Sequence, residues 1–153
     1  MKKLKFYVII TVLIMAAYAC STSKAVISHG VDLSKYSYVV FGNELTKDKE
    51  LADIAIAVQN EIVDTKLIVV SVQDAQIKIE QGEFVLTPDI YVKTEKWDGG
   101  HTYITITFYD YNTNQSVAVL KSSGIGLSIS QDQNIAFGAI KKKLKQTFGD
   151  KSE

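Results

Sequence analysis

The chain contains no arginine, so every positively charged side chain apart from histidine is a lysine. Arginine makes the planar, bidentate contacts by which many proteins recognise phosphate groups and guanine. The 17 basic residues are matched by 17 acidic ones, which leaves no excess positive charge to attract a polyanion. We therefore expect no nucleic-acid partner.

Cysteine and histidine are also scarce: Cys20 is the single cysteine, and His29 and His101 are the two histidines. A lone cysteine cannot form a disulfide within the chain. Transition-metal sites need several His, Cys or carboxylate ligands at suitable spacing. We expect neither a metal nor another cofactor.

One stretch resembles the start of a calcium loop, because Asp110, Asn112 and Asn114 stand at alternate positions in DYNTNQS. An EF-hand loop needs Gly at its sixth position and Glu at its twelfth, where this chain has Gln115 and Lys121. A polar hairpin turn is the favoured interpretation.

Motifs of catalysis are missing too. The sequence has no G-x-S-x-G, and SGIGLS contains Gly124 and Gly126 without the third glycine of a dinucleotide loop. We interpret these glycines as a bend or bulge in a strand. Glycoside hydrolysis by a pair of carboxylates stays an alternative, because the chain has 17 acidic residues, but nothing in the sequence singles out two of them. An enzyme is the weaker hypothesis.

No apolar run is long enough for a comfortable membrane span, which takes about 20 residues. The longest is FYVIITVLIMAA, residues 6–17, preceded by Lys2, Lys3 and Lys5. A basic start, a short apolar run and small residues after it are typical of a secretory signal peptide. We predict one over residues 1–19.

The predicted signal ends in Ala17-Tyr18-Ala19-Cys20, which resembles the lipobox of bacterial lipoproteins. That resemblance implies cleavage before Cys20 and acylation of its thiol with palmitate-type chains. Ser21 in second place suggests sorting to the outer membrane, facing the periplasm. The same residues also fit an ordinary A-x-A cleavage site, which would leave a free thiol. We favour the lipoprotein, with residues 20–25 as a tether.

Residues 26–149 are predicted to form a single α+β domain, large enough for its own core. The expected architecture is a two-layer sandwich, with a mostly antiparallel sheet containing a β-meander and helices on one face. Ser130 and Gln133 are expected to form the capping box of the last helix. Expected strands are 37–43, 66–71, 89–97, 101–111 and 116–128, with KAVIS at 24–28 as a candidate start of a first strand; expected helices are 48–65 and 130–149. Residues 71–82 fit either a short helix or a strand, because Ile77 and Ile79 alternate, and we favour the helix.

The strand 101–111 alternates cleanly, with Ile104, Ile106 and Phe108 predicted to face the helices. The opposite face is rich in aromatic side chains. These side chains suit cross-strand pairing, and they also suit a contact surface for protein or glycan. The candidate surface consists of Tyr91, Trp97, Tyr103 and Tyr109.

The segments VDLSKYSYVVFG, TPDIYVKTEKW and TYITITFYDYNTNQSVAVLKSSGIG, followed by an amphipathic helix, resemble a family of small envelope lipoproteins. The family is known as domain of unknown function four-one-three-six. The best-matching pieces are residues 32–38, Pro88-Asp89-Ile90 and the hairpin at Asp110. The resemblance implies a lipid anchor and an α+β fold, and it supplies no catalytic residues.

Two functional hypotheses follow. The first is a lipid-anchored, non-catalytic module that is held to the membrane through Cys20 and binds another envelope protein or a glycan. The second is a small periplasmic enzyme or solute-binding domain. A flat aromatic sheet face favours the first, and a cleft with clustered acids of perturbed pKa favours the second.

Overall fold

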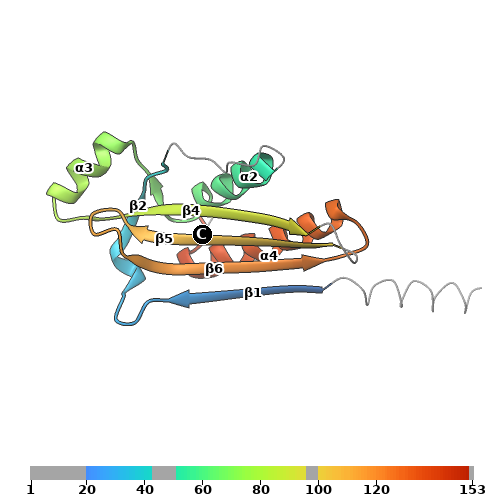
Figure 1. Cartoon of the computed structure of the whole chain (residues 1–153). Helices are drawn as coiled ribbons and strands as arrows, with labels where there is room; N and C mark the ends of the chain where they lie inside the picture. Colours follow the sequence, from blue (N-terminus) through green and yellow to red (C-terminus); the bar gives the residue numbers. More distant parts are fainter. Residues whose placement is uncertain (1–19, 43–50, 96–99, 152–153) are drawn as a thin grey trace, which may run out of the picture.

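The computed structural model describes residues 20–42, 51–95 and 100–151. It contains a six-stranded sheet in the order β1-β6-β5-β4-β2-β3 (Figure 1). Strand β2 is parallel to β3 and β4, and the remaining neighbours are antiparallel. The strands are β1 (Cys20–Ile27), β2 (Tyr36–Val39), β3 (Ile68–Val69), β4 (Phe84–Glu95), β5 (His101–Asp110) and β6 (Ser116–Ile125).

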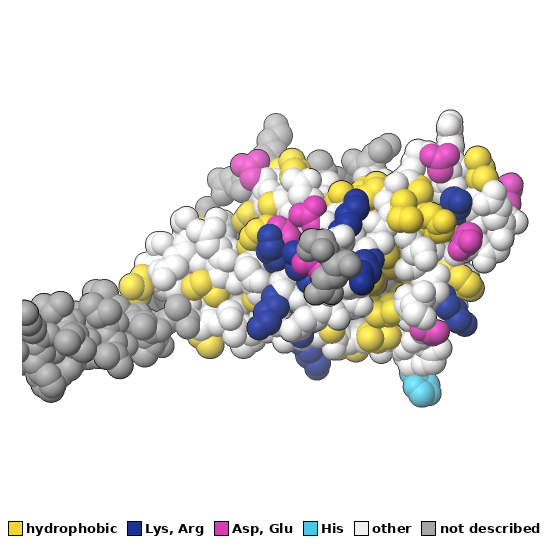
Figure 2. All heavy atoms as spheres, turned by 180° about the vertical axis from the view of Figure 1, so that it is seen from behind, with side chains coloured by type: hydrophobic (Ala, Val, Ile, Leu, Met, Phe, Trp, Pro, Cys, Tyr) yellow, Lys and Arg dark blue, Asp and Glu magenta, His cyan; other side chains and the backbone are white. Residues whose placement is uncertain are grey.

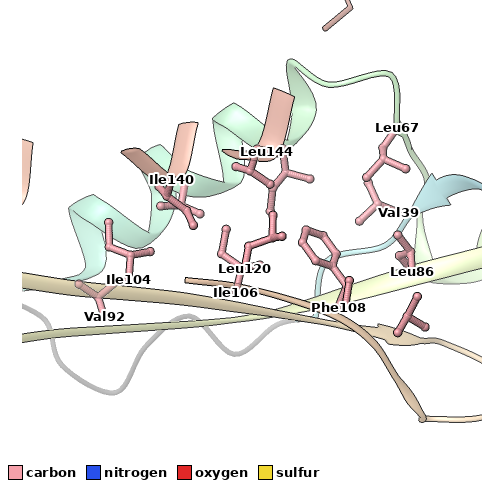
Figure 3. Close-up of a cluster of buried hydrophobic side chains, with 14 of the residues drawn as sticks. Val39, Leu67, Leu86, Val92, Ile104, Ile106, Phe108, Leu120, Ile140 and Leu144 are labelled. Atoms are coloured by element: carbon pink, nitrogen blue, oxygen red, sulfur yellow. The ribbon is translucent and has the colours of Figure 1, made fainter. Parts of the chain in front are cut away.

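The helices pack on this open sheet, so the predicted α+β class is confirmed. The 3-10 helix η1 (Leu33–Lys35) precedes β2, and the longer helices are α2 (Ala52–Val63), α3 (Val72–Glu80) and α4 (Ile129–Phe148). The main core lies between the sheet and α2 and α4, where Ile106, Phe108, Ile140 and Leu144 are fully buried (Figure 3).

Helix α3 differs from the single-face prediction. Along β4, Leu86 belongs to the main core, whereas its neighbour Val85 packs with Val40 and Ala75 in a second, smaller cluster. Adjacent strand residues point to opposite faces, so α3 lies on the other side of the sheet from α2 and α4. The helix covers only the beginning of β4, and among the described residues no other helix lies over that face (Figure 1).

The alternation predicted for residues 101–111 is confirmed, since Ile104, Ile106 and Phe108 are completely buried and Tyr103 and Tyr109 are half-buried. The polar stretch after Asp110 is a turn, as expected.

The single proline, Pro88, sits inside β4 without breaking it. Tyr111 donates its backbone N–H to Val85 O at 2.9 Å, so odd-numbered residues of β4 hydrogen-bond with β5. The missing N–H of Pro88 therefore points to the other edge of β4, beyond the end of β2.

Residues 20–25, predicted to be a tether, are instead part of β1. Each residue from Cys20 to Ile27 has a partner in β6, beginning with Cys20 opposite Ile125. The hydroxyls of Thr22 and Ser123 are 2.7 Å apart on the paired strands. The polar residues of this stretch show no strand pattern of their own. They form a strand because they pair with β6, which lies about a hundred residues away in the sequence. The predicted signal peptide, residues 1–19, and Trp97 lie outside the described residues.

Helix α4 begins two residues earlier than predicted. Ser128, not Ser130, is its N-cap, and the Ser128 hydroxyl accepts a hydrogen bond from Gln131 N at 3.2 Å. Both serines are followed three residues later by glutamine, so spacing alone cannot separate them.

Gly124 marks a close approach of α4 to β6 rather than a bulge. A Cβ atom at Gly124 would lie 2.5 Å from Ala136 N and would also collide with the carbonyl oxygen of Asp132. Ser122, two residues before it, donates its hydroxyl to Ala136 O at 2.8 Å. The absence of a side chain at Gly124 lets the helix backbone rest directly on the strand.

Candidate functional site: the uncovered face of the sheet

The face opposite α4 is formed by alternate residues of β4, β5, β6 and β1. Tyr91 lies beside Thr105, and Tyr103 lies beside Lys93. Tyr91 and Tyr103 are thus diagonal neighbours, at roughly 7–8 Å by the usual sheet spacing. Tyr109 lies on the same face toward the other end, opposite Thr87. The structure therefore brings Tyr91 and Tyr103 together and leaves Tyr109 apart.

Tyr91 is the most accessible of the three tyrosines, with 57% of its surface exposed. Tyr103 and Tyr109 are half-buried. The ring of His101 stacks on Tyr103, with centroids 5.8 Å apart and an interplanar angle of 16°. Rings held by the sheet present apolar faces with polar tips, which suits contact with a protein surface or a sugar ring.

An ion pair borders the tyrosines. Lys93 Nζ and Glu95 Oε1 are 2.7 Å apart. Their hydrogen bond raises the pKa of Lys93 and lowers that of Glu95. The two side chains are 53% and 42% exposed, so the pair adds little stability and its groups stay accessible to a partner.

The face becomes positively charged toward its β1 edge. Lys121 on β6 and Lys24 on β1 are directly opposite each other, and both are exposed. Lys121 also lies beside Thr105, which in turn lies beside Tyr91. One row across four strands thus contains the ring of Tyr91, the hydroxyl of Thr105 and the ammonium groups of Lys121 and Lys24. These groups can bind a partner that carries hydroxyl groups or negative charge.

Tyr36 and Asp110 form a second polar cluster, at the β5–β6 turn. One Asp110 oxygen accepts from Tyr36 Oη at 3.0 Å, and the other accepts from Asn112 N, Thr113 N and the Thr113 hydroxyl. Burial and the hydrogen bond to Asp110 raise the pKa of Tyr36 to about 12. The carboxylate is thus engaged in fixing the turn to η1–β2, and the phenol stays neutral at physiological pH.

Three hollows of the described surface have a known lining. One of 230 Å³ lies between α3 and the β5–β6 turn, and it contains Asp110 with the bonds just given. Another, of 320 Å³, is lined by Tyr36, Lys66 and Phe148 among others. Within residues 20–42, 51–95 and 100–151, no three His, Cys, Asp or Glu side chains are grouped as metal ligands.

An open hollow of 480 Å³ is lined by residues of the C-terminal half of α4 together with Gly149 and Asp150. Figure 2 shows lysine side chains gathered on one face of the molecule. Lysine side chains surround the hollow, but Lys141 pairs with Glu61 at 2.7 Å and Lys145 pairs with Asp150 at 2.5 Å. These ion pairs link α4 to α2 and to the chain's end. Cations near the C-terminus of a helix are also favoured by the helix dipole.

Asp132 is a buried acid that the sequence reasoning missed. Its side chain is completely buried in the first turn of α4, and Oδ1 accepts a hydrogen bond from Gly126 N. Oδ2 is buried without a hydrogen-bond partner. A carboxylate in the first turn is favoured by the helix dipole and by the nearby N–H groups. In the sequence, only the two glycines at positions 124 and 126 indicate that the strand and the helix pack closely here.

Cys20 is a free, exposed thiol at the first described residue. In the described part of the chain, no helix has the length and apolar character needed to cross a membrane.

No protein-family model matches the chain, and no curated protein matches it. Among solved structures, it is similar to the PelC dodecamer from Paraburkholderia phytofirmans, with a TM-score of 0.51 and 16% identity over 84% of this chain and 99% of that one. A single-substitution variant of that dodecamer gives a TM-score of 0.51 and 16% identity, over 84% and 98% of the two chains. A PDZ domain protein from Parabacteroides distasonis gives a TM-score of 0.50 and 10% identity, over 88% of this chain and 39% of that one. At such identities the likeness shows the fold alone.

Proposed function

We propose that this chain is a lipid-anchored protein of the bacterial outer membrane, facing the periplasm, that binds another envelope protein or a glycan without catalysing a reaction. The observation that carries the binding part is the uncovered sheet face with Tyr91 and Tyr103 side by side. A sheet face that has no helix over it and holds rigid aromatic groups offers a contact area at low entropic cost.

The anchor part of the proposal rests on the sequence. The lone Cys20 follows a basic and apolar segment of the kind that directs secretion. The exposed position of its sulfur is compatible with acylation. One acyl chain holds a protein only marginally, whereas two or more give a stable anchor. The resemblance to small envelope lipoproteins supports the same assignment and stays a prediction.

Fractionation of cells tests the anchor. Wild type should sediment with the outer membrane and incorporate labelled palmitate, and Cys20→Ala should move to the soluble fraction without label. Ser21→Ala is a matched control that keeps the thiol, so it should behave like wild type in uptake of label. The anchor is wrong if wild type takes up no label and Cys20→Ala stays with the membrane.

Capture from the envelope tests the binding face. The double substitution Tyr91→Ala and Tyr103→Ala should leave the fold intact and remove the partner from a crosslinked pull-down. Asn60→Ala, on an exposed position of α2, should keep the partner. Proteomic analysis and glycan digestion of the captured material distinguish a protein from a glycan. Equal capture by all three proteins would contradict a role for this face.

Self-assembly is a second proposal, and it is favoured by two observations. The similar PelC chains form a dodecamer. Within the described residues of this chain, β1 and β3 are the two edge strands of the sheet. Ser28 N donates to Val117 O at 2.9 Å, so even-numbered residues of β1 pair with β6 and odd-numbered ones present free N–H and C=O groups.

Light scattering in detergent tests this assembly. We expect particles whose protein mass is several times that of one mature chain beginning at Cys20. Ala25→Pro on β1 removes one outward N–H and should reduce that mass, whereas Ser123→Ala, inside the sheet, should not. A monomeric wild type would exclude the assembly.

A further inference from the structure

The end of the molecule where β1 begins carries exposed apolar side chains. Cys20 is opposite Ile125, the last residue of β6, and the chain then turns into α4. Leu127 and Ile129 in this turn are 67% and 42% exposed. Figure 1 shows the start of β1, the end of β6 and the start of α4 together at one end of the sheet.

The turn holds Leu127 outward through a set of hydrogen bonds. Leu127 N donates to Gln131 Oε1 at 2.9 Å, and Gly126 N donates to the buried Asp132 carboxylate. The Ser128 hydroxyl accepts from Gln131 N at 3.2 Å. These bonds fix the turn in a conformation in which Leu127 and Ile129 are exposed beside the polar side chains of Ser128 and Ser130.

The chain outside the described residues joins at the same end. Residues 6–17 form an uncharged, apolar run, and only Tyr18 and Ala19 lie between this run and Cys20. Acyl chains on Cys20 would also enter the bilayer from this point. Because β1 begins at Cys20 itself, no tether separates the anchor from Leu127. Either kind of anchor would hold Leu127 and Ile129 at the membrane surface.

We propose that this apolar end, defined by Ile125, Leu127 and Ile129, docks into the lipid surface beside the anchor and fixes the domain in one orientation. The inference rests on the membrane anchor proposed above. The strands would then stand away from the bilayer with α3 at the distal end, which keeps the tyrosine face open toward the periplasm. Apolar side chains next to a lipid anchor add to its membrane affinity.

Tryptophan fluorescence tests the docking. With Trp97→Phe as background, Leu127→Trp gives a single reporter at the proposed contact. Ile77→Trp, at a 50% exposed position of α3, gives a matched reporter at the distal end. The full chain is purified from bacterial membranes and reconstituted into phosphatidylethanolamine–phosphatidylglycerol vesicles with or without bromine on the acyl chains.

Brominated lipid should quench the reporter at position 127 strongly and leave the reporter at position 77 unchanged. An unquenched reporter at position 127, or equal quenching of both, would overturn the docking. Mass spectrometry of the Cys20 peptide reports the anchor independently. If Cys20 carries no lipid, its thiol is coupled to a maleimide phospholipid, so the anchor proposal fails while the same quenching still decides the docking.

Discussion

Replacing Gly124 by alanine should destabilise the protein strongly, whereas replacing Gly138 by alanine should stabilise it. At Gly124 the new methyl group would lie 2.5 Å from Ala136 N and 2.9 Å from Ile135 Cβ. Non-bonded heavy atoms prefer separations of about 3.5–4.0 Å. Helix α4 would have to move by about 1 Å away from β6, which strains the hydrogen bond between Ser122 and Ala136.

Overpacking of this kind typically costs about 1–3 kcal/mol, and here the obstacle is helix backbone, so we expect about 3 kcal/mol. Gly138 is inside α4, and a Cβ atom there meets nothing within 4 Å. Alanine should therefore raise the free energy of unfolding by about 0.5–1 kcal/mol.

Urea unfolding of the purified variants measures both effects. With a slope of roughly 1–3 kcal/mol per molar urea, a loss of about 3 kcal/mol lowers the midpoint by about 1–3 M. Gly138→Ala should raise the midpoint slightly. If Gly124→Ala unfolds at the wild-type midpoint, α4 does not rest on β6 at this residue, and the packing described here is wrong.

Two further predictions concern the sheet and its polar cluster. Ile106→Asp should unfold the domain in circular dichroism, because removing this fully buried side chain alone costs about 2–5 kcal/mol and the buried charge adds to that. Tyr109→Ser, on the other face, should keep a cooperative melt; a loss of structure equal to that of Ile106→Asp would mean that both faces are buried. Tyr36→Phe should lose about 1 kcal/mol at pH 8 with the hydrogen bond to Asp110. Because the folded-state pKa of Tyr36 is raised from 10.0 to about 12, wild type should also lose stability between pH 10 and pH 12, and Tyr36→Phe should lose less; parallel pH profiles of the two proteins would refute the assignment.

Local patterns in the sequence predicted much of this fold. The alternation from Ile104 to Phe108 identified the core face of β5. The sequence of the last helix predicts an apolar stripe of Ala136, Phe137, Ile140, Leu144 and Phe148; three of them are fully buried, and Phe137 and Phe148 are partly buried against the same core. Both patterns are periodic over several turns or residue pairs, so the signal accumulates along the element.

Features that depend on contacts between residues far apart in the sequence could not be predicted from local patterns. The strand from Cys20 has an irregular polar sequence, and its structure comes from hydrogen bonds to β6. The position of α3 depends on Val40 and Val85, whose neighbours Val39 and Leu86 are equally apolar. Such uninterrupted apolar runs do not reveal which residue faces which side of a sheet.

The candidate surface was partly accessible to sequence reasoning. The period of two correctly placed Tyr91, Tyr103 and Tyr109 on one face, but it gave no neighbours across strands. The register adds Lys93, Lys121 and Lys24, which come from three different strands. Their proximity arises only when the strands align, and therefore no linear motif records it.

Site-specific photocrosslinking in intact cells tests the central claim most directly. A benzophenone amino acid replaces Tyr91 on the uncovered face or Asn60 on α2, in otherwise wild-type chains. We expect a discrete adduct with an envelope protein or glycan from position 91 and none from position 60. Adducts from position 60 alone, or the same adducts from both positions, would contradict the assignment of the uncovered sheet face as the binding surface.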